Sequence, residues 1–189
     1  MNGEGVSGTE EMVIKTIFSG FGGQGVIMMG YLLATAGMHE EKNVTCLPAY
    51  GAEVRGGTAN CTVVISTEEI ASPVASEPEY AVLMNTPSLL RFQNQVQSRG
   101  MIFLNSSMID SRPVRGDLEV FEVPANDLAK QLQEDRVTNM VMLGAFIKKT
   151  GLVTFDTMAH VLKDTLANRN PTLAKLNQSA LSLGYDYLK

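Results

Sequence analysis

Residues 12–26, MVIKTIFSGFGGQGV, decide the fold class. The first seven are mostly apolar, β-branched or aromatic and alternate little, which indicates a strand buried on both faces. A glycine-rich stretch, 19–25, follows, and residues 26–39 are apolar on nearly all sides, as expected of a helix packed between a sheet and another layer. A strand, a glycine loop and a helix in this order open an α/β domain.

The rest of the chain continues this alternation and then becomes helical. Further buried strands are predicted at 44–47, 60–66, 79–84, 101–104 and 119–123. Helices are predicted at 88–96, 127–133, 137–149, 155–166 and 172–187.

The connections between these elements favour a particular sheet. The strands on either side of the helix at 26–39 should run parallel, with a right-handed crossover. The connection from 47 to 60 is glycine-rich and has no helical period, so an antiparallel return is expected there. The prediction is a three-layer α/β/α fold with a mostly parallel but mixed sheet, a glycine-rich loop after the first strand and a helical C-terminal third.

Length and charge limit the functional classes. A chain of 189 residues fits a single domain at 12–189, and residues 1–11 are expected to form a short disordered tail. With 15 basic and 20 acidic side chains the net charge is -5, the wrong sign for holding nucleic acid or an anionic membrane. The tail does not resemble a signal peptide, and the longest apolar stretch, 26–38, is shorter than the roughly 18 residues of a membrane span. A cytoplasmic location is therefore expected.

Metal and nucleophilic chemistry find little support in the residue types. Cys46 and Cys61 are the two cysteines, whereas an iron–sulfur cluster normally takes four thiolates. His39 and His160 stand far apart and lack metal-ligand spacing, and no Ser-His-Asp or Cys-His arrangement is evident. Neither catalytic residues nor a metal site are expected in this chain.

The glycine loop is the first candidate binding site. Its members satisfy the Gly-x-Gly-x-x-Gly pattern between a strand and a helix: Gly20, Gly22, Gly23, Gln24 and Gly25. Such glycines allow a backbone to approach a phosphate, and the start of a helix attracts negative charge. A dinucleotide site would also need an acidic residue after the second strand, where residues 47–50 are LPAY. The alternative is that the glycines only allow the helix to pack closely on the strand.

The second candidate is the glycine-rich loop after the second strand. It contributes Tyr50, Glu53, Arg55, Gly56 and Gly57. A guanidinium between glycines can bind a phosphate or carboxylate through two hydrogen bonds, and this loop should share the sheet edge of the first. The alternative is an exposed ion pair between Arg55 and Glu53.

Weaker candidates follow other strands. Asn85 and Asn105 end strands where α/β ligand clefts form, although asparagine is also an ordinary turn residue. Asn139, in an apolar helix start, is expected to make a structural hydrogen bond or to face a partner subunit. The methionines are expected to be core or interface residues.

Five motifs, in this order, resemble one family. They are GFGGQGV at 20–26, YGAEVRGGTA at 50–59, IASP at 70–73, VPAN at 123–126 and NMVMLGA at 139–145. Over residues 12–187 the chain resembles the gamma subunit of 2-oxoacid:ferredoxin oxidoreductases, with the 2-oxoglutarate type closest. Ala52 stands where the second motif of the family leads us to expect proline.

The resemblance implies an accessory role in a complex. Such complexes oxidatively decarboxylate a 2-oxoacid with coenzyme A and pass the electrons to ferredoxin. The family places thiamine diphosphate, Mg²⁺ and the iron–sulfur clusters in the partner alpha, beta and ferredoxin-like delta subunits. This chain would cover the active site and help to receive coenzyme A through Gly20–Gly25 and Tyr50–Gly57, without binding a cofactor tightly. Without partners, exposed apolar surface would favour a homodimer.

Two alternatives stay open. A gamma-type subunit for pyruvate, branched-chain 2-oxoacids or indolepyruvate would share the glycine loop, because the substrate pocket belongs to other chains. A stand-alone nucleotide-binding module is the alternative outside this class.

Overall fold

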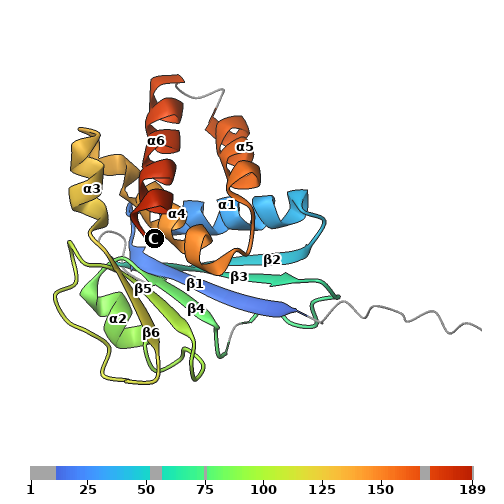
Figure 1. Ribbon diagram of the computed structural model, residues 1–189. Coiled ribbons are helices and arrows are strands. Elements are labelled where there is room, and N and C mark those ends of the chain that lie inside the picture. Colours follow the sequence, from blue (N-terminus) through green and yellow to red (C-terminus); the bar gives the residue numbers. More distant parts are fainter. Residues whose placement is uncertain (1–11, 52–56, 75, 167–170, 189) are drawn as a thin grey trace, which may run out of the picture.

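The computed structural model describes residues 12–51, 57–74, 76–166 and 171–188. Within them, six strands form one sheet in the order β2-β3-β1-β4-β5-β6 (Figure 1). The strands are β1 (Val13–Phe21), β2 (Asn43–Tyr50), β3 (Thr58–Ser66), β4 (Tyr80–Leu83), β5 (Met101–Asn105) and β6 (Glu119–Val123). The helices are α1 (Val26–His39), α2 (Thr86–Phe92), α3 (Ala125–Gln131), the 3-10 turn η1 (Asp135–Val137), α4 (Thr138–Thr150), α5 (Phe155–Leu166) and α6 (Pro171–Tyr187).

The sheet is mixed, as the sequence predicts. Strand β1 pairs in parallel with β4, β4 with β5, and β5 with β6, whereas β3 is antiparallel to both β1 and β2. Strands β1 and β2 therefore run in the same direction on either side of α1, but β3 lies between them. The antiparallel return of β3 fills the position that a simple β-α-β unit would give to β2.

The helices cover the two faces unequally. Helix α2 packs on one face, against a small cluster around Leu89 and Ile102. Helices α1, α3, α4, α5 and α6 lie on the other face, where α4 sits between the sheet and α6 (Figure 1). All residues from Thr138 to Ile147 are buried, which explains why α4 shows apolar residues on more than one side. The three-layer fold with a helical C-terminal third is confirmed.

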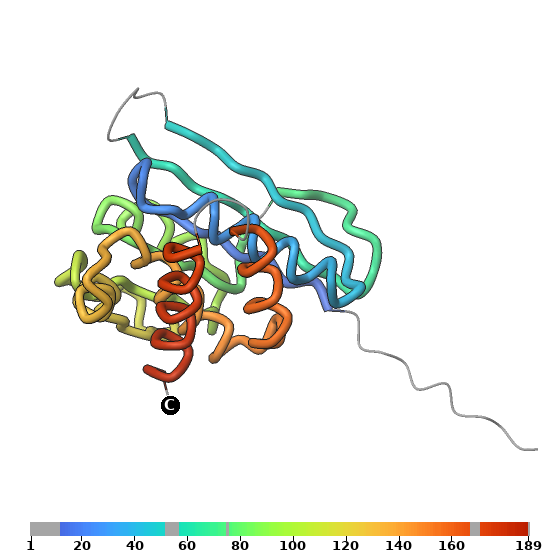
Figure 2. Tube along the Cα trace, turned by 90° about the horizontal axis from the view of Figure 1, so that it is seen from above, coloured from blue at the N-terminus to red at the C-terminus, as the bar shows by residue number. Residues whose placement is uncertain are grey.

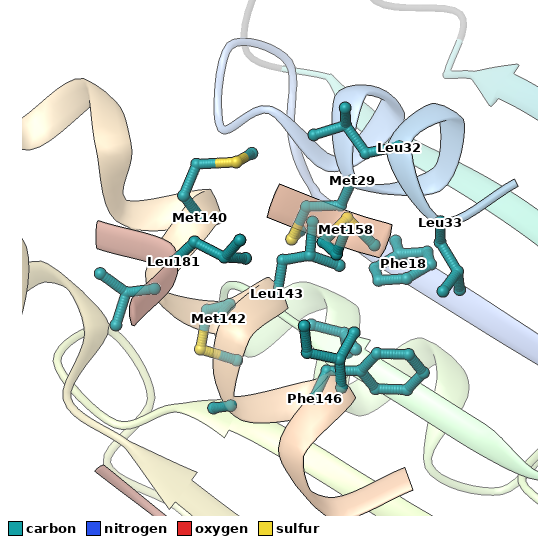
Figure 3. Packing of buried hydrophobic residues seen from close by; sticks show 14 of the residues in the cluster. Phe18, Met29, Leu32, Leu33, Met140, Met142, Leu143, Phe146, Met158 and Leu181 are labelled. Carbon is teal, nitrogen blue, oxygen red and sulfur yellow. The ribbon is translucent and has the colours of Figure 1, made fainter. Parts of the chain in front are cut away.

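Methionines and aromatic rings fill the larger core. Met29, Met140, Met142 and Met158 are almost fully buried there and lie close to Phe18 and Leu143 in Figure 3. Their flexible thioethers suit the irregular space between α1, α4 and α5. The core interpretation of these methionines therefore holds.

Phe146 of α4 is the centre of an aromatic group in this core. Its ring makes edge contacts with those of Phe18, Phe103 and Tyr80 at centroid distances of 5.6, 5.3 and 5.9 Å. Edge-to-face contacts of this kind add about 0.5–1.5 kcal/mol each beyond area burial. They fasten α4 to β1, β4 and β5.

Two glycines set the distance between α4 and α6. A Cβ at Gly184 would come within 1.8 Å of the Val141 carbonyl oxygen, and one at Gly144 within 2.0 Å of the Leu181 oxygen. The helix backbones therefore touch directly, and larger residues have no room. This contact makes α4 an inner helix and α6 an outer one.

The hairpin of β2 and β3 extends along one side of the molecule, with β2 as the outer strand of the sheet (Figure 2). Gly37 and Gly30 of α1 lie against its inner face, where a Cβ at Gly37 would come within 3.0 Å of Val44. The end of β2 at Tyr50 and the start of β3 lie beside the loop that joins β1 to α1.

Candidate functional site

The glycine loop joins β1 to α1 at the carboxyl edge of the sheet. Strand β1 continues to Phe21, three residues beyond the predicted end at Phe18, so the loop proper is 22–25. The Gly22 N–H donates to the Gly57 carbonyl oxygen at 3.0 Å, which ties the glycine loop to the second loop. Gly23 and Gly25 have φ values of 96° and 75°, in the left-handed region that glycine adopts without strain.

The glycines of this loop serve two purposes. A Cβ at Gly20 would come within 2.9 Å of Met84 and Val26, and one at Gly25 within 2.2 Å of Asn139 Nδ2, so these two glycines allow close packing. Among the described residues, a Cβ at Gly22 would meet only the Gly57 carbonyl oxygen, at 3.8 Å, and a Cβ at Gly23 would meet no atom within 4 Å. The packing alternative therefore holds for Gly20 and Gly25, whereas ligand binding at Gly22 and Gly23 stays a prediction.

The start of α1 favours an anion. Its N-cap is Gly25, which has no side chain to accept from the first-turn N–H groups, and the first turn carries no acidic residue. The first N–H groups of a helix have no partner within it, and the helix dipole makes this end partly positive. A phosphate or carboxylate placed here would find donors and favourable charge.

One cleft lies between the glycine loop and the β2–β3 hairpin. Its volume is about 240 Å³, and its walls are Phe21, Gly22, Gly23, Gly25, Val26, Ile27, Tyr50 and Ala59. Tyr50 is 74% exposed at its rim. The structure thus brings the first predicted loop and the start of the second together. The predicted site residues Glu53, Arg55 and Gly56 lie outside the described residues, as do residues 1–11.

Carboxamide side chains line the other flank of the glycine loop. Gln24 Oε1 accepts from the Phe21 N–H at 2.6 Å and from Asn85 Nδ2 at 3.0 Å. Asn85 also caps α2, because its Oδ1 accepts from the Ser88 N–H. The turn role considered for Asn85 is therefore present, together with a contact to the candidate loop.

Two further carboxamides continue this row. Asn105, at the end of β5, is fully buried and donates through Nδ2 to Asn126 Oδ1 at 2.7 Å. Asn139, at the start of α4, donates to the Gly25 carbonyl oxygen at 3.4 Å. A structural hydrogen bond was the expectation for Asn139, and its bond to Gly25 links the start of α4 to the glycine loop.

A second cleft, of about 200 Å³, opens among these residues. It is lined by Gly23, Gln24, Met84, Asn126, Asp135, Arg136, Thr138 and Asn139. The Oδ1 atoms of Asn139 and Asn105 are buried and have no hydrogen-bond partner within the part of the chain that the structure describes.

Two of the charged side chains around the second cleft form an ion pair with each other. Arg136 binds Glu134 at 2.6 Å, and the hydrogen bonds from Arg136 lower the pKa of Glu134 to about 2. The pair is exposed, so its energetic contribution is small. At neutral pH this flank carries Glu134, Asp135 and Arg136 and is polar and slightly acidic, in contrast to the uncapped start of α1 on the other flank.

Sequence reasoning missed Asn126, Asp135, Arg136 and Thr138 as residues of this site. Asn126 and Asn139 belong to two of the motifs that carry the family resemblance, VPAN and NMVMLGA. Those motifs were the available signal, but nothing in the local sequence says that α3 and α4 begin beside the glycine loop.

Two structural tests bear on the classes considered. Among the described residues, no group of three or more His, Cys, Asp or Glu side chains could hold a metal ion. In the same part of the chain, no helix is both long and apolar enough to cross a membrane.

Comparison with protein families and curated proteins gives a consistent result. The family model described as pyruvate ferredoxin/flavodoxin oxidoreductase matches residues 15–187. The ketoisovalerate oxidoreductase subunit VorA of Methanothermobacter thermautotrophicus is 34% identical over 178 residues, which cover 93% of this chain and 36% of the relative. The 2-oxoglutarate synthase subunit KorC of Methanocaldococcus jannaschii is 29% identical over 90% of this chain and 91% of the relative. Pyruvate synthase subunits PorC also match. The chain spans about a third of the length of the VorA relatives that it matches.

Solved structures share the fold. The gamma subunit of a keto/oxoacid ferredoxin oxidoreductase from Geobacter sulfurreducens has a TM-score of 0.79 at 23% identity, covering 93% of this chain and 98% of that one. A 2-oxoglutarate:ferredoxin oxidoreductase from Magnetococcus marinus, with 2-oxoglutarate, coenzyme A and succinyl-CoA bound, has a TM-score of 0.84 at 20% identity. It is covered to 31% of its length, against 96% of this chain.

Proposed function

The chain belongs to the pyruvate ferredoxin/flavodoxin oxidoreductase family, and from this membership we propose that it is the gamma subunit of a 2-oxoacid:ferredoxin oxidoreductase complex. The observation that carries the proposal is the match over residues 15–187, nearly the whole described chain. The KorC relative, aligned over 91% of its own length, is itself named a subunit. A stand-alone nucleotide-binding module is not favoured for this reason.

The proposed complex divides the chemistry among its chains. We place thiamine diphosphate, Mg²⁺ and the iron–sulfur clusters in alpha, beta and ferredoxin-like delta partners, with ferredoxin as the acceptor and the cytoplasm as the location. Two cysteines cannot supply the four thiolates of a cluster. Helix α1 and β2 expose Tyr31, Met38, Leu47 and Tyr50, which supports a partner on this side of the molecule or a homodimer of the isolated chain.

The first cleft is the proposed contact with coenzyme A. Open space at Gly22 and Gly23, the uncapped start of α1 and the exposed Tyr50 ring supply donors, positive potential and an apolar surface. The cleft is smaller than the roughly 300–1,000 Å³ of a complete small-molecule site. We therefore expect it to hold one phosphate-bearing part of coenzyme A, with Arg55 as an added cation and partner chains enclosing the rest.

For the 2-oxoacid we propose 2-oxoglutarate. The support is that KorC relatives align over most of their own length at 29–31% identity. A branched-chain 2-oxoacid is the second candidate, because the VorA relatives reach 33–34% identity. Purified complex assayed with 2-oxoglutarate, 2-oxoisovalerate and pyruvate separates them by their kcat/KM ratios.

Co-purification with an activity assay tests the subunit role. Tagged chain expressed in its source cells should bring thiamine-binding and cluster-binding partners, and the complex should reduce viologen with a 2-oxoacid and coenzyme A. The isolated chain should reduce none. Turnover by the isolated chain, or its purification without partners from those cells, would refute the gamma-subunit role.

Arg55→Ala in the reconstituted complex tests the coenzyme A contact. Loss of one charge-assisted hydrogen bond costs about 1.5–3 kcal/mol, so the KM for coenzyme A should rise about tenfold to a hundredfold. The KM for the 2-oxoacid should stay nearly unchanged. Arg112→Ala is the matched control, because Arg112 is an exposed arginine that pairs with Glu122 of β6, at the edge of the sheet away from β2. An unaltered KM with the complex intact would withdraw the coenzyme A assignment while leaving the subunit role standing.

A further inference from the structure

The two cysteines of the chain meet on neighbouring strands. Cys46 of β2 and Cys61 of β3 have their Sγ atoms 3.4 Å apart, and both thiols are free. In the register of the hairpin, Cys46 lies opposite Val63 and Cys61 opposite Pro48. The two cysteines are thus diagonal neighbours on one face of the sheet, separated by 15 positions in sequence.

A covalent bond between them needs only a small movement. The S–S bond length is about 2.05 Å, so the sulfurs must approach by about 1.4 Å. Strand β2 is the outer strand and pairs on one side with β3. Rotation of the two side chains and a slight shift of β2 can close the gap.

The environments of the two thiols differ in a way that orders the reaction. Cys46 is partly exposed, and a hydrogen bond from the Cys61 S–H lowers its pKa, although burial acts against this. Cys61 is fully buried, and its pKa is raised because it donates that hydrogen bond and is desolvated. The thiolate is the nucleophile in disulfide exchange, so Cys46 is the attacking group and Cys61 the resolving one.

We propose that Cys46 and Cys61 form a reversible intramolecular disulfide by exchange with a low-molecular-weight or protein disulfide, and that this pair is a redox modification site of the subunit. The Cys46 thiolate attacks the incoming disulfide RS–SR, which forms Cys46–S–SR and releases one thiolate. Cys61 then attacks the Cys46 sulfur, expels the second thiolate and gives up its proton. The two cysteines lose two electrons and two protons, and RS–SR becomes two RSH.

The bond would act on the hairpin that borders the first cleft. Tyr50, four residues after Cys46, ends β2, and Gly57, four residues before Cys61, immediately precedes β3. The Gly57 carbonyl oxygen accepts a hydrogen bond from the Gly22 N–H of the glycine loop. Helix α1 is also in contact, since a Cβ at Gly30 would come within 2.3 Å of the Cys61 sulfur. A disulfide therefore fixes the outer strand to the part of the sheet that carries α1 and the glycine loop.

Redox titration of the full chain tests this pairing. Reduced chain is equilibrated with glutathione buffers of increasing oxidised fraction, quenched with a maleimide in denaturant, and weighed intact by mass spectrometry. The reduced form should carry two maleimides. The oxidised form should carry none, weigh two hydrogen atoms less than the unlabelled chain, and return to the first state with dithiothreitol.

Single variants test the order of attack. Cys61→Ser should stop after the first step and accumulate a glutathione adduct on Cys46, whereas Cys46→Ser should stay largely unmodified because Cys61 is buried. Thiols that remain reduced in fully oxidised buffer, a stable glutathione adduct on the unaltered chain, or disulfide-linked dimers would each overturn the proposal. The result is independent of the proposed subunit role, since it requires neither partners nor activity.

Discussion

The α4–α6 contact and the glycine loop both depend on glycine, but they use it in opposite ways. At Gly144 and Gly184 a Cβ would strike the backbone of the facing helix at 2.0 and 1.8 Å. At Gly22 and Gly23 a Cβ would meet no atom of the described residues closer than 3.8 Å. Missing side chains let helices touch in the first region and leave room in the second. A glycine therefore indicates a ligand only where nothing in the chain fills the space that it leaves.

The helix contact should show the largest effect. Gly184→Ala places a methyl group against the Val141 carbonyl, and neither backbone can move without separating α6 from α4. The free energy of unfolding should fall by about 3 kcal/mol or more, the upper range for overpacking. Urea denaturation measures it. Gly116→Ala is the control, because no atom lies within 4 Å there, and a loss of similar size in both variants would remove the distinction.

The second largest loss of stability is expected at Gly25, the glycine of the loop that packs against Asn139. Gly25→Ala forces alanine into a left-handed conformation, at about 1–2 kcal/mol, and presses it against Asn139. Combining it with Asn139→Ala removes the two closest contacts, at 2.2 and 2.7 Å, but not the backbone strain at position 25. The double variant should therefore be more stable than the sum of the single losses by more than about 0.5 kcal/mol. Strict additivity in the thermodynamic cycle would mean that the two residues do not press on each other.

The open glycine should affect binding rather than stability. Gly22→Ala has room for its methyl group, so we expect the free energy of unfolding to change by less than about 0.5 kcal/mol. In the reconstituted complex the methyl group narrows the first cleft, and the KM for coenzyme A should rise about tenfold, equivalent to about 1.4 kcal/mol. Steady-state kinetics together with urea denaturation separate the two quantities. A destabilised variant with normal KM would place Gly22 among the packing glycines.

The smallest effect concerns charge beside the second cleft. Because hydrogen bonds from Arg136 lower the pKa of Glu134 from 4.5 to about 2, this pair stabilises the fold above pH 4.5 and loses its contribution as the pH falls toward 2. Glu134→Gln should remove that part of the acid sensitivity. Urea midpoints at pH 7 and pH 3 for both proteins provide the test. The same drop between the two pH values in both proteins would contradict the role of this pair.

Most of the fold could be predicted because local patterns specify it. The helix at 26–39 is found with the bounds expected, and the strands fall where runs of apolar and β-branched residues indicated them. Helix α2 ends at Phe92, earlier than the predicted 96, because the last part of that segment forms turns instead. The antiparallel return after β2 was predictable because its connection is too short and glycine-rich for a crossover helix.

The candidate site was only partly predictable. The glycine loop and Tyr50 meet as expected. Strand β1 ends just before the loop and β2 ends at Tyr50, and both ends lie at the same edge of the sheet. Asn126 and Asn139 reach that edge from α3 and α4, more than 100 positions after the loop. A local sequence pattern does not relate residues that are so far apart in the chain. The second cleft therefore depends on how α3 and α4 pack against the sheet.

The sequence by itself determined the elements of this protein, the mixed sheet and the place of the glycine loop, because hydrophobic periodicity and loop composition act between near neighbours. The tertiary structure alone decided that β3 lies between β1 and β2, which glycines pack and which stay open, and that Cys46 meets Cys61 at 3.4 Å. Those outcomes depend on what the opposing side chains and backbones occupy, and that is settled only when distant segments share one core.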